Sequence, residues 1–252
     1  IKKIKNIKII KKDANYLTNN SPKYDSYIFS HSLEHMININ TYLKNLSKKA
    51  IENSSLFISW PQQENWIKKS IPGTINFEHT YFINLKNLII LLNSIGFKLI
   101  KLKKFNNHSF FLYLLKDKTF SQKKYINYRK ENHLNFRDYY KSYENMYKFI
   151  NIKKFVSKEV YLMPASIYSQ YIFYYLNRYI KFIGIIDNSE SKQGKILFGT
   201  NLKIFNKNKI LNKKITIILS GGFHTEEIKR DLIDINSDIE IIDSRKLLNA
   251  KN

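Results

Sequence analysis

The stretch YDSYIFSHSLEHMININTYL, residues 24–43, decides the fold of the amino-terminal half of this chain. Residues 24–30 are rich in aromatic and β-branched side chains, which is typical of a β-strand. The run stops at His31-Ser32, and apolar residues then recur at positions 33, 36, 39, 43 and 46. That spacing predicts a helix over 33–50 with one buried face. A strand that leads directly into a helix is the repeating unit of an α/β sheet.

The same α/β pattern extends along the rest of the chain, with one interruption. Residues 116–156 are rich in Lys, Tyr and Asn and carry helical spacing without strands, so we expect a helical connector there. Further strands are expected at 7–10, 56–60, 98–105, 110–115, 159–163, 179–186, 215–219 and 239–242, with helices at 85–95, 166–177 and 226–235.

Composition excludes several classes of function. The 252 residues include 43 Lys and Arg against 20 Asp and Glu, a formal charge of +23, and no Cys. Disulfides, thiolate metal sites and Cys nucleophiles are therefore excluded. Only five basic residues are Arg, and the lysines are scattered, so we interpret the charge as a solvated surface and expect no nucleic-acid partner. No long uncharged apolar stretch occurs, so we expect no membrane span and a cytoplasmic location.

Polar residues follow the second strand, at the edge where an open α/β sheet binds its ligands. His31 and His35 are four residues apart, with Glu34 beside them. A shared helical face could hold a metal ion, but no third ligand follows at the spacing of helical zinc motifs. We therefore expect no metal site.

Two further groups lie in loops of the same half. Glu78 and His79 are adjacent, and a carboxylate can orient an imidazole for general base catalysis near neutral pH. A capping Glu beside a half-buried His explains the pair equally well. His108 lies in the turn of the last two strands, where a histidine is most often a turn residue.

Three segments, in this order, resemble the class I S-adenosylmethionine (SAM)-dependent methyltransferases, and within them the sugar C-methyltransferases. Residues 24–43 resemble that family's strand, His-x-x-Glu-His motif and apolar helix. INFEHTYFINLKNLIILLNSIGFKLIKLKKFNNHSFFLYLL, residues 75–115, is similar to its Tyr-x-Glu-His-x-x-Tyr-Phe loop, helix and later His-Gly-Gly-Ser turn. IIDNSESKQGKILFGTNLKIF, residues 185–205, resembles its carboxyl-terminal domain.

The resemblance implies three segments and a truncated start. Residues 1–117 would be the carboxyl-terminal part of a methyltransferase domain, a partial Rossmann-like sheet that ends in an antiparallel hairpin. Residues 118–156 would be the helical connector, and 157–252 a second small Rossmann-like α/β domain. The family's acidic Gly-x-Gly loop and ribose-binding acid are absent from the sequence. The strand at 7–10 would then be the family's third, and we expect the chain to be a fragment of a longer enzyme.

The resemblance also implies roles for residues, with SAM as the cofactor. His79, helped by Glu78, would remove a proton from the acceptor, and His31 and His108 would bind it or stabilise an enolate oxygen. Contacts to the cofactor would come from Asp13, Ala14 and His31, and contacts to the substrate from Asn76 and Tyr81. In the second domain, Ser166, Asp187 and Gly221-Gly222 lie at strand ends or in turns, and from that position we expect them to contact a nucleotide sugar.

The expected function is methyl transfer to a sugar or sugar nucleotide, and alternatives remain. Asn76 stands where the family has Tyr, Phe77 where it often has His, and His108-Ser-Phe-Phe replaces His-Gly-Gly-Ser. The departures at Asn76 and Phe77 favour an O-methyltransferase that acts on a glycan or small-molecule hydroxyl. A non-catalytic basic binding module is the alternative from another class, and the second domain could be a scaffold.

Overall fold

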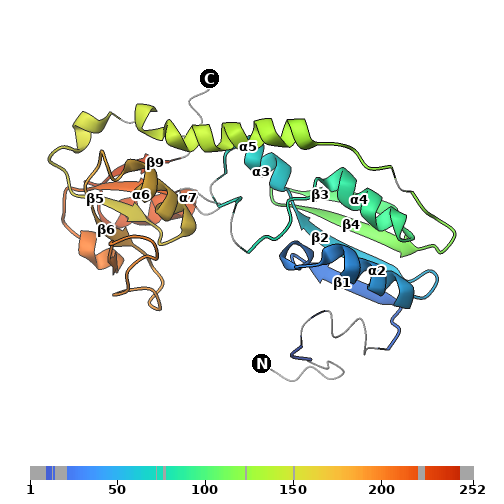
Figure 1. The fold of residues 1–252 in the computed structure, drawn as a ribbon. Helices are drawn as coiled ribbons and strands as arrows, with labels where there is room; N and C mark the ends of the chain where they lie inside the picture. The colour runs from blue at the N-terminus through green and yellow to red at the C-terminus, as the bar shows by residue number, and fades with distance from the viewer. Residues whose placement is uncertain are drawn as a thin grey trace. The chain divides into compact units, whose positions relative to one another are not determined.

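The computed structural model describes residues 10–12, 14, 22–71, 73–75, 78–122, 124–149, 151–220 and 225–244 (Figure 1). The chain divides into two compact units, the first formed by 1–65 and 76–128 and the second by 66–75 and 129–252. Most of the expected strand at 7–10 lies outside the described residues, as do Asp13, Asn76, Phe77 and Gly221-Gly222.

The first unit contains a four-stranded mixed sheet in the order β1-β2-β4-β3. Strand β1 (Ser26–Ser30) runs parallel to β2 (Ser55–Pro61). Strand β4 (Ser109–Lys116) lies antiparallel between β2 and β3 (Phe97–Phe105). The predicted α/β sheet with a terminal antiparallel hairpin is thereby confirmed.

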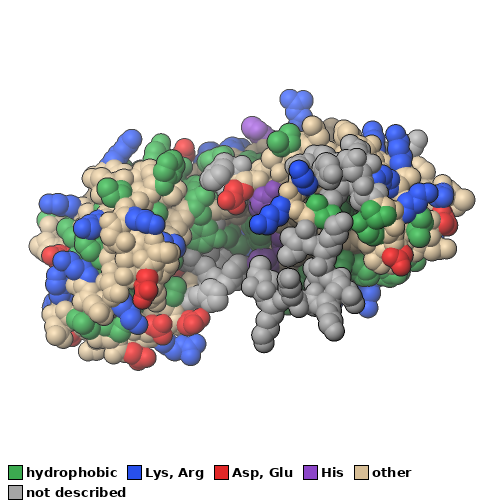
Figure 2. All heavy atoms as spheres, turned by 90° about the horizontal axis from the view of Figure 1, so that it is seen from below, with side chains coloured by type: hydrophobic (Ala, Val, Ile, Leu, Met, Phe, Trp, Pro, Cys, Tyr) green, Lys and Arg blue, Asp and Glu red, His purple; other side chains and the backbone are tan. Residues whose placement is uncertain are grey.

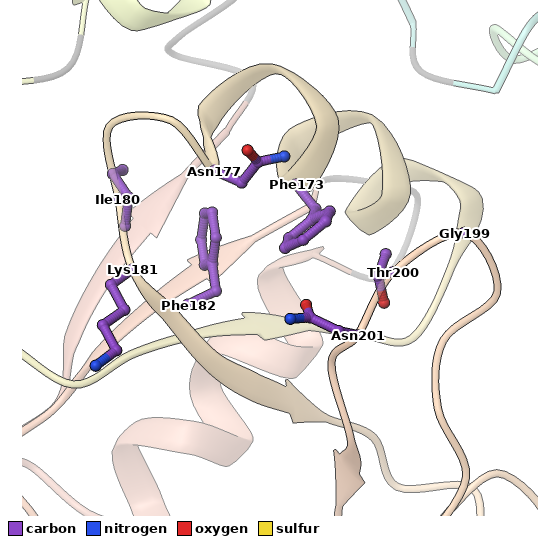
Figure 3. Close-up of a pocket in the computed structure, with 8 residues that line it drawn as sticks. All are labelled: Phe173, Asn177, Ile180, Lys181, Phe182, Gly199, Thr200 and Asn201. Carbon is purple, nitrogen blue, oxygen red and sulfur yellow. The ribbon is translucent and has the colours of Figure 1, made fainter.

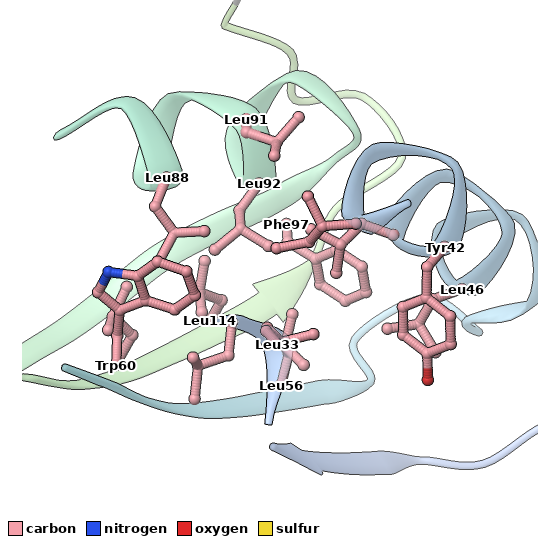
Figure 4. Close-up of a cluster of buried hydrophobic side chains, with 14 of the residues drawn as sticks. Leu33, Tyr42, Leu46, Leu56, Trp60, Leu88, Leu91, Leu92, Phe97 and Leu114 are labelled. Atoms are coloured by element: carbon pink, nitrogen blue, oxygen red, sulfur yellow. The ribbon is translucent and has the colours of Figure 1, made fainter. Parts of the chain in front are cut away.

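Helices α2 (Ile39–Lys49) and α4 (Leu85–Ser94) bury their apolar faces in one core with the sheet (Figure 4). Leu88 and Leu92 of α4 and Leu56 of β2 belong to this core, and all three are fully buried. Burying one such side chain contributes about 1.5–3 kcal/mol. The core therefore holds both helices against the strands, and the short helix α3 (Gln63–Lys68) follows β2 directly.

The helix predicted over 33–50 is broken near its start. A 3-10 turn, η1 (Leu33–His35), is followed by an extended Met36, with φ −79° and ψ 132°, and α2 begins afterwards. A loop distant in sequence donates hydrogen bonds to the carbonyl groups of this segment: Thr80 Oγ1 donates to Met36 O and Tyr81 OH donates to Ile37 O. The break therefore comes from a long-range contact that helical periodicity does not encode.

A buried lysine ties the ends of the helices to the sheet. Lys116, at the end of β4, is 5% exposed. Its Nζ donates to Ser47 Oγ of α2 at 2.6 Å and to Ile95 O, after α4, at 2.7 Å. Carbonyl groups at helix ends lack intrahelical donors, and a cation satisfies them. Gly96, predicted to close the helix, has φ +81°, and a Cβ there would lie 2.7 Å from Lys116 Nζ.

The second unit contains a five-stranded parallel sheet in the order β7-β6-β5-β8-β9, which confirms the Rossmann-like α/β architecture. The chain starts at the central strand and moves outward first to one side and then to the other. Since crossovers are right-handed, the two connecting helices lie on opposite faces of the sheet. Its elements are β5 (Val160–Met163), α6 (Ile167–Leu176), β6 (Phe182–Ile186), β7 (Ile204–Phe205), η4 (Lys207–Ile210), β8 (Thr216–Leu219), α7 (Thr225–Ile235) and β9 (Glu240–Asp243).

Tyrosines pack the predicted helical segment against this unit. The segment forms α5 (Arg129–Glu144), η2 (Met146–Phe149) and η3 (Ile152–Phe155). Tyr143 of α5 is fully buried, lies 5.2 Å from the Tyr171 ring centroid, and donates its hydroxyl to Ser70 O at 2.8 Å. Tyr171 donates to Ile75 O at 3.0 Å. Burial raises the pKa of both hydroxyls, so they stay protonated.

The surface carries dispersed positive charge. Lys and Arg side chains are spread over both units on the face shown in Figure 2, among polar and apolar side chains. Among the described residues, no helix has both the length and the apolar character needed to cross a bilayer.

Raising the pH above about 10 is expected to destabilise the second unit. An unfolded tyrosine loses its proton near pH 10, whereas Tyr143 and Tyr171 hold theirs in the folded state. The folded state then binds more protons, so the unfolding free energy falls as pH rises. Circular dichroism together with tyrosinate absorbance measures this. Tyr143→Phe should flatten the alkaline limb and cost about 1 kcal/mol at pH 7 through the lost hydrogen bond. An alkaline limb as steep as in the parent protein would contradict the assignment.

Candidate functional site

The candidate site lies where β1 and β2 end and β4 begins. His31 follows β1, Gln62 and Gln63 follow β2, and Ser109 opens β4 opposite Pro61. Strand β4 runs antiparallel to β2, so it begins at the edge of the sheet where β1 and β2 end. The residues after β1 and β2 therefore lie close to Ser109. This is the edge at which α/β sheets bind their ligands.

A chain of hydrogen bonds joins four side chains at this edge. His31 Nδ1 lies 3.2 Å from Glu34 Oε1, and His31 Nε2 lies 2.8 Å from Ser109 Oγ. Ser109 Oγ in turn contacts His108 Nδ1. An ionised carboxylate only accepts hydrogen bonds, so His31 donates from Nδ1. With His31 neutral, Ser109 donates to it and His108 donates to Ser109, which leaves the lone pair of His108 on Nε2.

The hydrogen bonds link Ser109, His31 and Glu34 in the order serine, histidine, carboxylate, as in a hydrolase triad. Ser109, however, is too buried to act as a nucleophile. Ser109 is 1% exposed, and a nucleophile has to reach its substrate. His108, by contrast, is only partly buried. Ser109 is therefore best described as a bridge that couples the two imidazoles.

The backbone at His31 is strained. Its φ is +46°, in the left-handed region that residues with a Cβ rarely adopt. The turn is held because His31 N donates to Ser59 O of β2 at 3.2 Å and the side chain is bonded at both nitrogens. Strain of this kind persists where surrounding contacts over-determine it, which is common at functional sites.

A second group of side chains meets Glu34 from another direction. Glu34, His35 and His79 each present a ligand atom, and these atoms all lie within 4.8 Å of one another. His35 donates from Nδ1 to Glu78 O at 2.8 Å, and the His35 and His79 ring centroids are 5.0 Å apart. The third potential metal ligand, which local spacing did not predict, comes from the loop at 78–81.

Two imidazoles of the candidate site, those of His79 and His108, have lowered pKa values because they are partly buried. Burial lowers the pKa of His79, and Glu34 is the strongest opposing influence, ahead of Glu78. It also lowers the pKa of His108, with a further decrease from His31. Both rings are therefore neutral at pH 7. Glu78 was expected to help His79, and its backbone oxygen does fix His35, but the buried Glu34 exerts the larger effect.

Two glutamines position the site, and the sequence did not single them out. Gln62 donates from Nε2 to Ser109 O at 2.9 Å and to Asn106 O at 3.1 Å, which holds the hairpin that carries Ser109. Gln63 Nε2 lies 3.0 Å from His79 Nδ1. Both glutamines are at most 3% exposed. In the sequence they are marked only by their place, as a Gln-Gln pair directly after a strand.

Of the other predicted residues in the first unit, Tyr81 and Ala14 lie beside the hydrophobic core. Tyr81 OH is bound to Ile37 O, and both Tyr81 and Ala14 pack against the hydrophobic core. Asp13 and Asn76 lie outside the described residues.

In the second unit, the Asp187 side chain is hydrogen-bonded by its own loop and by the turn after β5. It is 4% exposed, and its carboxylate accepts from Ala165 N and Ser189 N, each at 2.8 Å, and from Lys192 Nζ at 3.1 Å. Gln193 Nε2 donates to Asp187 O at 3.1 Å. The Asp187…Lys192-Gln193 motif thus holds the loop after β6 together, and substrate contact by Asp187 stays a prediction.

Ser166 begins α6 at the centre of the same edge. It caps the helix by accepting from Ser169 N at 3.4 Å, and its Oγ lies 3.3 Å from Ser220 Oγ, after β8. These two residues flank the point where the strand order reverses, the usual ligand position in such sheets. Substrate contact by Ser166 stays a prediction.

A cavity of about 580 Å³ in this unit lies at the opposite end of the strands (Figure 3). Phe173 and Phe182 face each other across it, with ring centroids 6.1 Å apart. Phe182 is the first residue of β6, so the cavity lies at the amino end of the sheet and contains none of the predicted site residues.

Comparison with known proteins yields weak structural similarity. No protein-family model matches the chain, and no curated protein matches it. A magnesium protoporphyrin IX methyltransferase from Synechocystis PCC 6803, solved with bound SAH, is 18% identical with a TM-score of 0.32. The match covers 40% of this chain and 48% of that one, so this chain spans about half of its length. A putative DNA modification methylase from Thermus thermophilus is 9% identical over 92% of this chain and 97% of that one, with a TM-score of 0.27. At these scores neither similarity identifies the activity of this chain.

Because the pKa values of His79 and His108 are lowered, the first unit is expected to lose stability at acidic pH. A histidine whose folded pKa lies below its unfolded value of about 6.5 stabilises the fold above that pH, and this contribution is lost as the pH falls. NMR titration should place the midpoints of His79 and His108 below 6.5, with signals assigned from His79→Gln and His108→Gln. Midpoints above 6.5 would contradict the burial of the two rings.

Replacing Asp187 with Asn should destabilise the second unit by about 1–3 kcal/mol, because one oxygen that accepts from a backbone N–H becomes a donor. Urea unfolding measures the change. Asp234→Asn, at an exposed position on α7, is the matched control and should have little effect. Parent-like stability in the Asp187 variant would favour a binding role instead.

Proposed function

We propose that this protein transfers a methyl group from SAM to a small acceptor of the sugar or nucleotide-sugar type, with His79 as the proton-removing group. One observation carries the proposal. Two neutral imidazoles, His79 and His108, converge with a buried carboxylate, Glu34, at the ligand-binding edge of an α/β sheet. The methyltransferase resemblance assigns His79 and His108 to the acceptor side, and the structure adds Glu34 beside His79.

The chemistry asks little of the protein beyond alignment and proton removal. His79 accepts a proton from an acceptor carbon next to a carbonyl, or from a hydroxyl. The electron pair left on that atom would take the methyl group that SAM supplies, with S-adenosylhomocysteine as the second product. His79 would then pass its proton to water.

Gln63 determines whether His79 can act in this way. When its amide nitrogen donates to His79 Nδ1, the proton of the neutral ring lies on Nε2, which then cannot accept another. With the amide reversed, Gln63 Oε1, a buried atom without a hydrogen-bond partner, accepts from Nδ1–H. Nε2 then carries the lone pair, so the reversed amide is the catalytic arrangement.

His108 can hold an acceptor oxygen in two ways, and His31 selects between them. With His31 neutral, His108 presents its Nε2 lone pair and accepts a hydrogen bond from a hydroxyl. With His31 protonated beside Glu34, His31 donates to Ser109, Ser109 donates to His108 Nδ1, and His108 donates from Nε2. The second arrangement suits an enolate oxygen.

The described residues would form the acceptor side of such a site. SAM would supply an electrophilic methyl group. Among the described residues of the first unit the glycine is Gly96, which closes α4, so the described part of this unit holds no glycine-rich loop for the methionyl group. The proposal therefore assigns no described residue to SAM.

In the full-length protein, His79→Gln is expected to lower turnover by about 100-fold or more, as is typical when a general base is removed. SAH formation is measured with a panel of keto-bearing nucleotide sugars, and SAM affinity, measured by calorimetry, should change little. His133→Gln, at an exposed position on α5, is the matched control. Equal turnover in the His79 variant, or no SAM binding by the parent protein, would refute the proposal. NMR of the product separates C-methylation from O-methylation.

A further inference from the structure

We propose that Glu34, His35 and His79 bind a divalent transition-metal ion of the zinc type. Their ligand atoms lie within 4.8 Å of one another. Two imidazole nitrogens and one carboxylate oxygen form a donor set that zinc accepts, with a position left open for water or a substrate oxygen. Magnesium and calcium prefer all-oxygen sites, so the donor set selects against them.

The three side chains are held in place before any ion binds. Glu34 and His35 lie in η1, directly after β1, and His79 lies in the loop at 78–81. Thr80 fastens that loop to η1, because its N and Oγ1 donate to Glu34 O at 2.9 and 3.0 Å. Donor atoms around tetrahedral zinc, at bonds of about 2.0–2.1 Å, are about 3.4 Å apart, so small side-chain rotations complete the site.

Neighbouring groups determine which ring nitrogen of each histidine carries the lone pair that would bind the metal. Glu78 O can only accept a hydrogen bond, so His35 carries its proton on Nδ1 and its lone pair on Nε2. Gln63 with its amide reversed does the same for His79. Metal-binding histidines almost always donate their second ring nitrogen to a carbonyl or carboxylate in this way.

Glu34 supplies an independent reason for a cation. The residue is 1% exposed, and its Oε2 is buried without a hydrogen-bond partner, while Oε1 contacts His31. A carboxylate oxygen withdrawn from water without a donor is unfavourable. A metal ion coordinated by Glu34 would compensate that oxygen directly.

The ion and the catalytic base exclude one another, because both use the Nε2 lone pair of His79. Saturating Zn²⁺ should therefore stop methyl transfer, and this consequence alone rests on the proposed function. Binding of the ion does not depend on it and is measured without SAM.

The test titrates Co²⁺ into the untagged, chelator-treated full-length protein and follows the visible absorption of tetrahedral cobalt, then displaces Co²⁺ with Zn²⁺. We expect one site per chain. His35→Asn and His79→Gln should each weaken Co²⁺ binding by more than about 100-fold, beyond the 10–100-fold typical of groups that only support a ligand. Glu34→Gln should do the same, and Gln63→Ala should weaken binding by about 10–100-fold.

His133→Gln, exposed on α5, is the matched control and should bind as tightly as the parent protein. Circular dichroism identifies any variant that fails to fold, and His35→Asn, at an exposed residue, keeps the test decisive if the buried Glu34 variant does not fold. No cobalt absorption, or binding that survives His35→Asn and His79→Gln, would overturn the proposal. Metal binding without SAM turnover would refute the proposed function alone.

Discussion

The buried side chain of Glu34, shortly after the first parallel strand, is the constraint on which the site of the first unit depends. With the side chain 1% exposed, His31 turns toward it at the expense of a left-handed backbone. The loop that carries His79 is fastened to the same residue through Thr80. Ser109 and His108 extend the chain of hydrogen bonds from His31 into the hairpin. His31, Ser109 and His108 are thus linked to the carboxylate of Glu34, whereas the loop that carries His79 is bonded to the backbone carbonyl of the same residue.

Local periodicity was sufficient to predict most of the secondary structure. The strands at 56–60 and 110–115 and the helix at 85–95 needed only apolar patterns and a closing glycine, and they form as β2, β4 and α4. The helix at 33–50 was predicted too long, because its first residues bond to Thr80 and Tyr81. The strand expected from 179 begins at Phe182, because the preceding residues still bond to Leu176 O at the end of α6. Short elements with little pattern, α3 and β7, were not predicted.

The candidate site was predictable only in part, for a similar reason. Histidines at strand ends are visible in the sequence, and His31, His79 and His108 do lie in or beside the network. The importance of Glu34 and Gln63 depends on burial, which comes from segments far along the chain. Asp187 shows the reverse case. Its carboxylate, in a motif that resembles part of a binding domain, accepts hydrogen bonds from two backbone N–H groups and from Lys192, and the sequence does not reveal these partners.

The segment 66–75 has a consequence for the modularity of the chain. It belongs to the second unit although the first unit resumes after it. The hydroxyls of Tyr143 and Tyr171 donate hydrogen bonds to two of its carbonyl groups, those of Ser70 and Ile75. A gene segment that began at residue 129 would encode tyrosines whose acceptors are left behind. The second unit therefore cannot be transferred between proteins as one continuous cassette, and recombination that conserves it has to carry both stretches together.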